Sequence, residues 1–241
     1  MILAIYFLST SCNLLAYVRQ LMPVCVLLLS IFHVQVGAQN LNNSSSFTLS
    51  VIADCQYANQ PNKGERLYTQ CPNKLAQAVT AINKQSPTAV IHLGDFIDTD
   101  FNSFDRLLKI TNKLTPSFYH VLGNHEFSVA DKFKTRITHT LNMPARYYTL
   151  DRFNWRFIAL DGNDVSTYGW PKDSPQHAKN MALYQGKYQG HENWNGAIGK
   201  QQMLWLTQQL QLATQQNKHV VLLSHFPIYP ENPHNLWNAE E

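Results

Sequence analysis

The stretch TAVIHLGDFID, residues 88–98, decides the fold of this chain. Residues 88–93 form an apolar run of strand length, and such a run is typical of a strand buried on both faces of a sheet. Gly94 and Asp95 follow at once, and glycine lets the backbone turn sharply so that the next side chain reaches the rim of the sheet. The stretch therefore predicts a buried strand with a carboxylate at its carboxyl end.

Three further apolar runs end in the same way. Residues 47–53, 117–122 and 219–223 lead into Asp54-Cys55-Gln56, Gly123-Asn124-His125-Glu126 and Ser224-His225. Each polar residue alone could be a turn former, a helix cap or a buried histidine. Four strands that end in metal-binding atoms favour a ligand site instead, at the edge where open α/β sheets place theirs. Hard oxygen ligands with one imidazole suit Mn²⁺, Fe²⁺, Mg²⁺ or Zn²⁺ better than a thiolate-binding metal.

Helices are predicted at residues 72–84, 104–114 and 200–216, where apolar residues recur at helical spacing. The first two alternate with the strands, which predicts β-α-β units and a mainly parallel sheet in an α/β fold. Residues 147–150 and 155–160 predict an antiparallel hairpin. The irregular segment at residues 161–199 is long for a compact domain and indicates a functional loop or a lid.

The strand-end motifs resemble, in their order along the chain, those of the calcineurin-like metallophosphoesterase superfamily. Most members have histidine where this chain has Gln56. Glutamine at this position resembles the pattern of the manganese-dependent ADP-ribose/CDP-alcohol diphosphatase branch. The motif Trp194-Asn195-Gly196 and the segment that follows Ser224 resemble the same branch. The resemblance covers residues 47–230. It implies a mixed β-sandwich flanked by helices, in four layers α/β/β/α, formed by a domain of residues 47–241.

The resemblance also implies an activity. It predicts a metal-dependent hydrolase of phosphoric ester or anhydride bonds, and within that class a diphosphatase of nucleoside-diphosphate-linked substrates. Two divalent metal ions, manganese in the first place and iron, magnesium or zinc as alternatives, would share the attacking hydroxide. Two other interpretations stay open: another phosphodiesterase or phosphomonoesterase of the superfamily, and a non-catalytic remnant that binds no metal pair.

Five residues receive metal-binding roles from the resemblance. Asp95 would bridge the two ions. Asp54 and Gln56 would bind the first ion, and Asn124 and His225 the second. The resembled pattern continues with a Gly-His-x-His block beyond the Ser-His motif, and this sequence has none. Each ion would therefore lack one ligand in this chain, which predicts a domain that is incomplete at its C-terminus.

His125 would face the leaving group as a general acid or charge stabiliser. Asp98 and Glu126 would orient the residues that bind metal or substrate. Asn195 is a weaker candidate for a substrate contact. Three aromatic residues could also contact a base or a sugar, although most aromatic residues at such places only pack: Tyr57, Tyr68 and Trp194.

The N-terminal residues 1–38 contain no acidic residue and one basic residue, Arg19. Neither of their apolar runs is long enough to span a bilayer, and the second ends in Val36-Gly37-Ala38. This pattern predicts a signal peptide cleaved after Ala38, followed by a polar linker at residues 39–46. The mature chain would be secreted or periplasmic, without a stable membrane anchor. An uncleaved anchor and a start at Met22 are the alternatives.

Cys55 and Cys71 remain after such cleavage. They could pair in an oxidising compartment, but two free thiols are slightly favoured. Without Arg19 the chain has 18 basic residues, from 19 in the whole sequence, against 16 acidic residues. A net charge of this size gives no basic surface for a nucleic acid. The expected partner is a small phosphorylated or nucleotide-like substrate, and the oligomeric state stays open.

Overall fold

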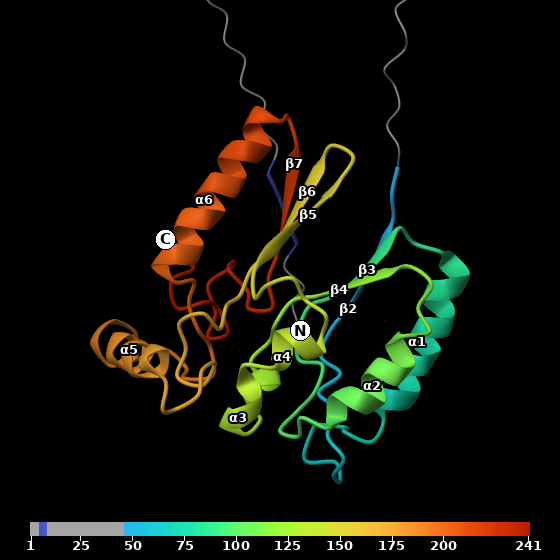
Figure 1. Cartoon of the computed structure of the whole chain (residues 1–241), viewed down its shortest axis with the longest axis horizontal. Helices are drawn as coiled ribbons and strands as arrows, with labels where there is room; N and C mark the ends of the chain where they lie inside the picture. Colours follow the sequence, from blue (N-terminus) through green and yellow to red (C-terminus); the bar gives the residue numbers. More distant parts are fainter. Residues whose placement is uncertain (1–4, 9–45) are drawn as a thin grey trace, which may run out of the picture.

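The computed structural model describes residues 5–8 and 46–241. Its first sheet is parallel, with strand order β2-β3-β4. The strands are β2 (Leu49–Ile52), β3 (Ala89–His92) and β4 (Ser117–His120). The connecting helices α1 (Cys71–Gln85) and α2 (Ser103–Thr111) pack against each other on the outer face of this sheet (Figure 1).

The second sheet is mixed, with strand order β1-β7-β6-β5. Its strands are β1 (Ile5–Leu8), β5 (Tyr148–Arg152), β6 (Trp155–Ala159) and β7 (His219–Leu223). Strands β5 and β6 form the predicted antiparallel hairpin, and β6 runs parallel to β7. Helix α6 (Lys200–Gln215) covers the outer face of this sheet (Figure 1).

Three apolar clusters hold these layers together. Ile91 of the first sheet packs with Phe157 and Val221 of the second, so one cluster lies between the sheets. Another joins Leu75 of α1 to Phe104 of α2. The third packs Ile158 and Val220 against Leu206 of α6. The order is therefore helices, sheet, sheet, helix, which confirms the predicted four-layer architecture.

The segment at residues 161–199 is more regular than predicted. It contains α5 (Pro175–Leu183) and one π-helical turn, η2 (Tyr184–Tyr188). Ser174 caps α5, because its hydroxyl accepts a hydrogen bond from the backbone N–H of His177, and Pro175 fixes the first turn. Three short elements were not predicted: η1 (His125–Phe127), α3 (Asp131–Lys134) and α4 (Ile137–Thr140).

A disulfide joins Cys55 to Cys71, with a Cα–Cα separation of 5.5 Å. The preference for free thiols was therefore wrong. The two cysteines lie 16 residues apart, and only the packing of α1 beside the end of β2 brings them together.

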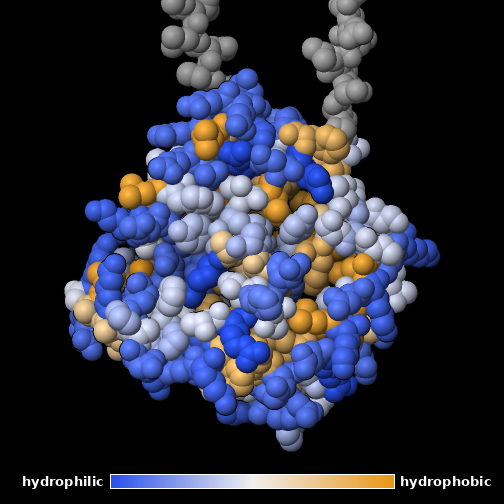
Figure 2. All heavy atoms as spheres, viewed as in Figure 1, coloured by the Kyte–Doolittle hydropathy of each residue, from blue (hydrophilic) through white to orange (hydrophobic). Residues whose placement is uncertain are grey.

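The predicted signal peptide and linker lie outside the described residues, except for β1 and Ser46. Strand β1 pairs antiparallel with β7. Among the residues that the structure describes, no helix has the length and apolar character needed to cross a membrane. Figure 2 shows a mostly hydrophilic face on which apolar side chains occur in small groups.

Candidate active site

The predicted site residues follow the carboxyl ends of four strands. Asp54 and Gln56 follow β2, and Asp95 follows β3. All three have positive φ angles, of 56°, 44° and 59°, which are unusual for residues with a Cβ and cluster at functional sites. Backbone hydrogen bonds hold the two loops side by side: Asp54 N–H donates to the Gly94 oxygen at 3.1 Å and Gln56 N–H to the Asp95 oxygen at 2.8 Å.

Two glycines allow this close approach. A Cβ on Gly94 would lie 2.6 Å from the backbone nitrogen of Gly123. A Cβ on Gly123 would lie 2.2 Å from a carboxylate oxygen of Asp95. The loops after β3 and β4 can therefore bring Asp95 and Asn124 to one place only with glycine at both positions.

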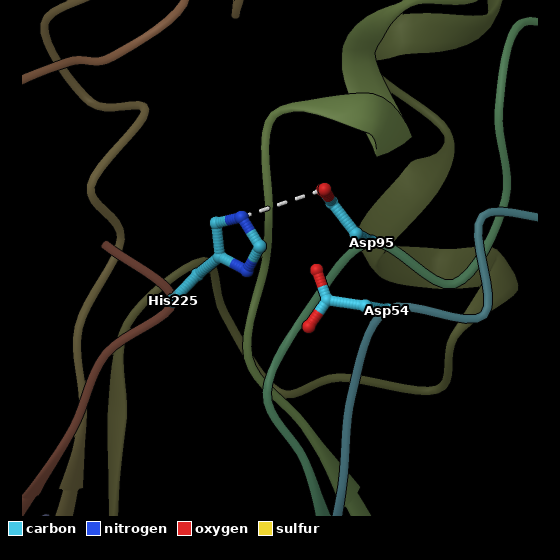
Figure 3. Close-up of side chains that lie close together, drawn as sticks. All are labelled: Asp54, Asp95 and His225. Atoms are coloured by element: carbon cyan, nitrogen blue, oxygen red, sulfur yellow. Dashed lines mark ion pairs between the residues drawn. The ribbon is translucent and has the colours of Figure 1, made fainter. Parts of the chain in front are cut away.

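Asp54, Asp95 and His225 form a three-residue cluster, whose possible ligand atoms all lie within 4.8 Å of one another (Figure 3). His225 Nε2 lies 3.5 Å from an Asp95 oxygen. Burial raises the pKa of Asp54; His225 opposes this shift and the charge of Asp95 adds to it. A buried carboxylate, Asp95, and a partly buried one, Asp54, beside an imidazole are a donor set that a divalent cation would stabilise, so these residues fit a metal ion.

Gln56 and Asn124 lie at the same place. The Gln56 side-chain amide donates to Asp95 Oδ2 at 3.0 Å. Asn124 lines a cavity of about 770 Å³ together with Asp54, Asp95 and His225. All five predicted metal ligands therefore border one cavity, and their role as ligands stays a prediction.

His125 lines the same cavity and is paired with Asp98. Its Nδ1 lies 2.9 Å from Asp98 Oδ1, and its Nε2 lies 3.9 Å from Asp95 Oδ2. Asp98 also accepts hydrogen bonds from the Tyr68 hydroxyl at 2.7 Å and from Arg66 at 3.1 Å. Burial alone would lower the pKa of His125, but the Asp98 hydrogen bond and the charge of Asp95 outweigh burial and raise it. The pair therefore favours a protonated imidazole that faces the cavity.

Glu126 binds the loops after β3 and β4 through backbone hydrogen bonds. Its side chain is fully buried and accepts backbone hydrogen bonds from Asp95 and Phe96, at 3.0 and 2.5 Å, and from Gly123 at 2.8 Å. Burial, with the nearby charge of Asp95, raises the pKa of Glu126 to about 7. Glu126 thus orients Asp95 through the backbone and has no place in the wall of the cavity.

Asn195 does not line the cavity. It is buried, and its side-chain amide donates to the backbone oxygens of Pro233 at 2.7 Å and Asn235 at 3.0 Å. Asn195 therefore holds the segment that carries His234, and a substrate contact by Asn195 stays a prediction.

Of the aromatic residues considered, Trp194 lines the cavity and packs against His234, with ring centroids 5.0 Å apart. Tyr57 and Tyr68 are buried and bind Arg106 and Asp98 instead. Arg66 and His234 also line the cavity and were not predicted to do so. Both come from loops without a strand-end pattern, so the sequence carried no signal for them.

The comparisons with known proteins agree with this geometry. The family model of calcineurin-like phosphoesterases matches residues 47–241. The rice (Oryza sativa subsp. japonica) protein named manganese-dependent ADP-ribose/CDP-alcohol diphosphatase is 30% identical in an alignment that covers 81% of this chain and 71% of the relative. The human protein of the same name is 28% identical in an alignment that covers 83% of this chain and 73% of that protein.

Among solved structures, a dimetal phosphatase from Danio rerio superposes with a TM-score of 0.68 at 25% identity, over 80% of this chain and 75% of that one. Family, relatives and fold point in the same direction as the cluster of carboxylates and imidazole. The chain belongs to the calcineurin-like phosphoesterase family and is a metallophosphoesterase, a hydrolase of phosphoric ester or anhydride bonds.

Proposed function

We propose that this chain is a manganese-dependent diphosphatase that cleaves the anhydride bond of nucleoside-diphosphate-linked substrates such as ADP-ribose and CDP-alcohols. One observation carries the proposal: Asp54, Asp95 and His225 meet in a cavity that also holds the His125–Asp98 pair. Its volume, about 770 Å³, lies in the range that holds nucleotide-sized ligands. The names of the relatives supply the substrate class.

Two divalent ions would be held by the five predicted ligands. Asp95 would contribute to both, Asp54 and Gln56 to one, and Asn124 and His225 to the other. His225 Nδ1 lies 2.8 Å from the backbone oxygen of Leu93, so it donates there and leaves Nε2 free for a metal. When bound, such ions supply an activated water and positive charge for the phosphoryl oxygens.

His125 would act as the general acid. A protonated His125 keeps its Nδ1 hydrogen on Asp98 and presents the Nε2 hydrogen to the cavity. As the bond from phosphorus to the leaving oxygen breaks, that proton passes to the oxygen, and neutral His125 remains hydrogen-bonded to Asp98. Arg66, next to His125 Nε2 at 3.5 Å, adds positive charge on the same side.

The far wall of the cavity would receive the nucleoside. Trp194 and His234 line the cavity there, and aromatic rings stack on bases. This wall favours a substrate with a nucleoside over a simple phosphomonoester, which leaves such a wall unused.

A substrate panel with Mn²⁺ tests the proposal. ADP-ribose, CDP-choline, cyclic AMP and a simple phosphomonoester are incubated with the purified chain, and the products are separated by chromatography. We expect AMP with ribose 5-phosphate from ADP-ribose, and CMP with phosphocholine from CDP-choline. Preferential turnover of cyclic AMP or of the monoester would favour the other activities of the superfamily. Binding of less than about one Mn²⁺ per chain would favour the non-catalytic remnant.

We also propose that residues 1–38 are a signal peptide and that the mature chain is secreted or periplasmic. The composition of this segment supports the proposal, and so does the Cys55–Cys71 disulfide, because disulfides persist in oxidising compartments. Cleavage would remove β1 from the edge of β7. Mass spectrometry of the exported protein should find Gln39 as its first residue; a membrane-bound chain that retains residues 1–38 would support the anchor instead.

A further inference from the structure

The disulfide is attached to the loop that carries two of the predicted metal ligands. Cys55 is the residue between Asp54 and Gln56, the two side chains that would hold one ion. Its partner, Cys71, is the first residue of α1. The bond therefore ties the loop after β2 to a helix on the outer face of the sheet.

The loop has two kinds of anchor. On the side of β3 it is held by backbone hydrogen bonds from Asp54 and Gln56 to the loop that carries Asp95. On the side of α1 it is held by the disulfide. Both Asp54 and Gln56 have left-handed backbones, with φ of 56° and 44°. Because residues with a Cβ disfavour this conformation, surrounding contacts must maintain it.

Helix α1 is a firm support for such an anchor. Its inner face is buried through Pro72, Leu75, Val79 and Ile82, and the helix packs on α2. Both cysteines also pack against the apolar cluster that contains Leu75 and Phe104. Because the helix is held firmly, the disulfide also holds the loop after β2 in place.

We propose that the Cys55–Cys71 disulfide is a positioning element of the metal site: it holds Asp54 and Gln56 at Asp95 and so strengthens Mn²⁺ binding. This inference rests on the proposed function, because it requires that the site binds Mn²⁺. Cys55 and Cys71 line a second cavity, of about 880 Å³, on the helix side of the loop. The bond is thus accessible to a small reductant, and reduction weakens Mn²⁺ binding while the fold persists.

The test compares Mn²⁺ affinity in the oxidised chain, in the chain reduced with a phosphine, and in the Cys55→Ala/Cys71→Ala variant, by calorimetric titration. We expect reduction to weaken binding about tenfold, and the double variant to match the reduced chain and ignore the reductant. Leu206→Ala is the control, because it weakens the packing of α6 on the second sheet but leaves α1 and the disulfide intact. It should lower the melting temperature without changing the Mn²⁺ affinity of the oxidised chain.

Hydrogen exchange without metal gives a second readout that needs no variant. The amides of Asp54 and Gln56 should exchange faster after reduction, while those of β3 stay protected. Equal Mn²⁺ affinity and equal exchange before and after reduction would overturn the inference and leave the proposed function intact. No Mn²⁺ binding by the oxidised chain would overturn the proposed function, and this inference with it.

Discussion

His225 donates its Nδ1 hydrogen to the backbone oxygen of Leu93, 2.8 Å away, and this bond joins the two sheets at the metal site. A carbonyl oxygen can only accept, so the bond fixes which ring nitrogen carries the hydrogen. The other nitrogen, Nε2, lies 3.5 Å from Asp95. One backbone contact thus orients the imidazole toward the carboxylates that it would join in binding a metal ion.

The first prediction concerns His225→Ala. Mn²⁺ affinity should fall by about a hundredfold or more, because the variant loses a direct ligand, whereas loss of a mere supporting contact costs about 10–100-fold. Calorimetric titration measures the affinity, and circular dichroism verifies the fold. His219→Ala is the control, since His219 is exposed at the start of the same strand. Unchanged affinity in His225→Ala would remove His225 from the metal site.

The second prediction concerns Glu126→Gln. The carboxylate accepts three backbone hydrogen bonds, whereas an amide offers one oxygen and turns its NH₂ toward a donor. We expect a loss of about 1–3 kcal/mol in the free energy of unfolding, and weaker Mn²⁺ binding because Asp95 loses its support. Thermal melts and metal titration measure both quantities. Glu192→Gln, at an exposed position, should change neither; wild-type melting by Glu126→Gln would contradict the role of Glu126.

The sequence anticipated the parts of the site that depend on strand ends. The runs that became β2, β3, β4 and β7 are apolar. The parallel sheet brings the carboxyl ends of β2, β3 and β4 to one edge, and β7 of the second sheet ends beside them, where His225 reaches Asp95. Gly94 and Gly123 also indicate that the loops after β3 and β4 approach each other closely. Local pattern and topology point to the same place here, so residues far apart in sequence could be assigned to one cavity.

The rest depends on packing that no local pattern encodes. Arg66 reaches the cavity from a loop, and Cys71 meets Cys55 only after α1 has docked beside β2. Asn195 faces backbone oxygens although its motif matched the resembled branch. Helix α5 did have a local signal, Ser174-Pro175, within a polar segment whose composition suggested a loop.

The third prediction concerns the pH dependence of stability. Arg156 binds Asp151 across the β5–β6 hairpin with two hydrogen bonds of 2.9 Å each. These bonds, together with the ion pair to Lys218, lower the pKa of Asp151 to about 2. A carboxylate whose folded pKa lies below its ordinary value of 3.8 stabilises the fold above that value and loses this contribution as the pH falls toward 2. The melting temperature of Asp151→Asn should therefore lie below that of wild type at pH 6, and this difference in melting temperature should become smaller below about pH 4.

Thermal melts from pH 6 to pH 3 measure this difference. Asp173→Asn serves as the control, because Asp173 is exposed in the loop before α5, and its difference from wild type should stay near zero throughout. A constant difference in melting temperature for Asp151→Asn down to pH 3 would mean that the ion pairs of Asp151 with Arg156 and Lys218 do not contribute through the ionised carboxylate.

The fourth prediction separates catalysis from metal binding at His125. His125→Ala should lower kcat by about 10²–10⁴-fold on ADP-ribose, because the departing phosphate oxygen then receives no proton from the ring that Asp98 holds. On an ester with a nitrophenol leaving group the loss should be much smaller, since that oxygen leaves without protonation. The Mn²⁺ affinity of His125→Ala should stay within a few-fold of wild type. His139→Ala, at an exposed position in α4, is the control and should turn over both substrates at the wild-type rate. Equal losses on the two substrates would assign His125 to stabilising charge instead of donating a proton, and full activity on ADP-ribose would exclude it from the reaction.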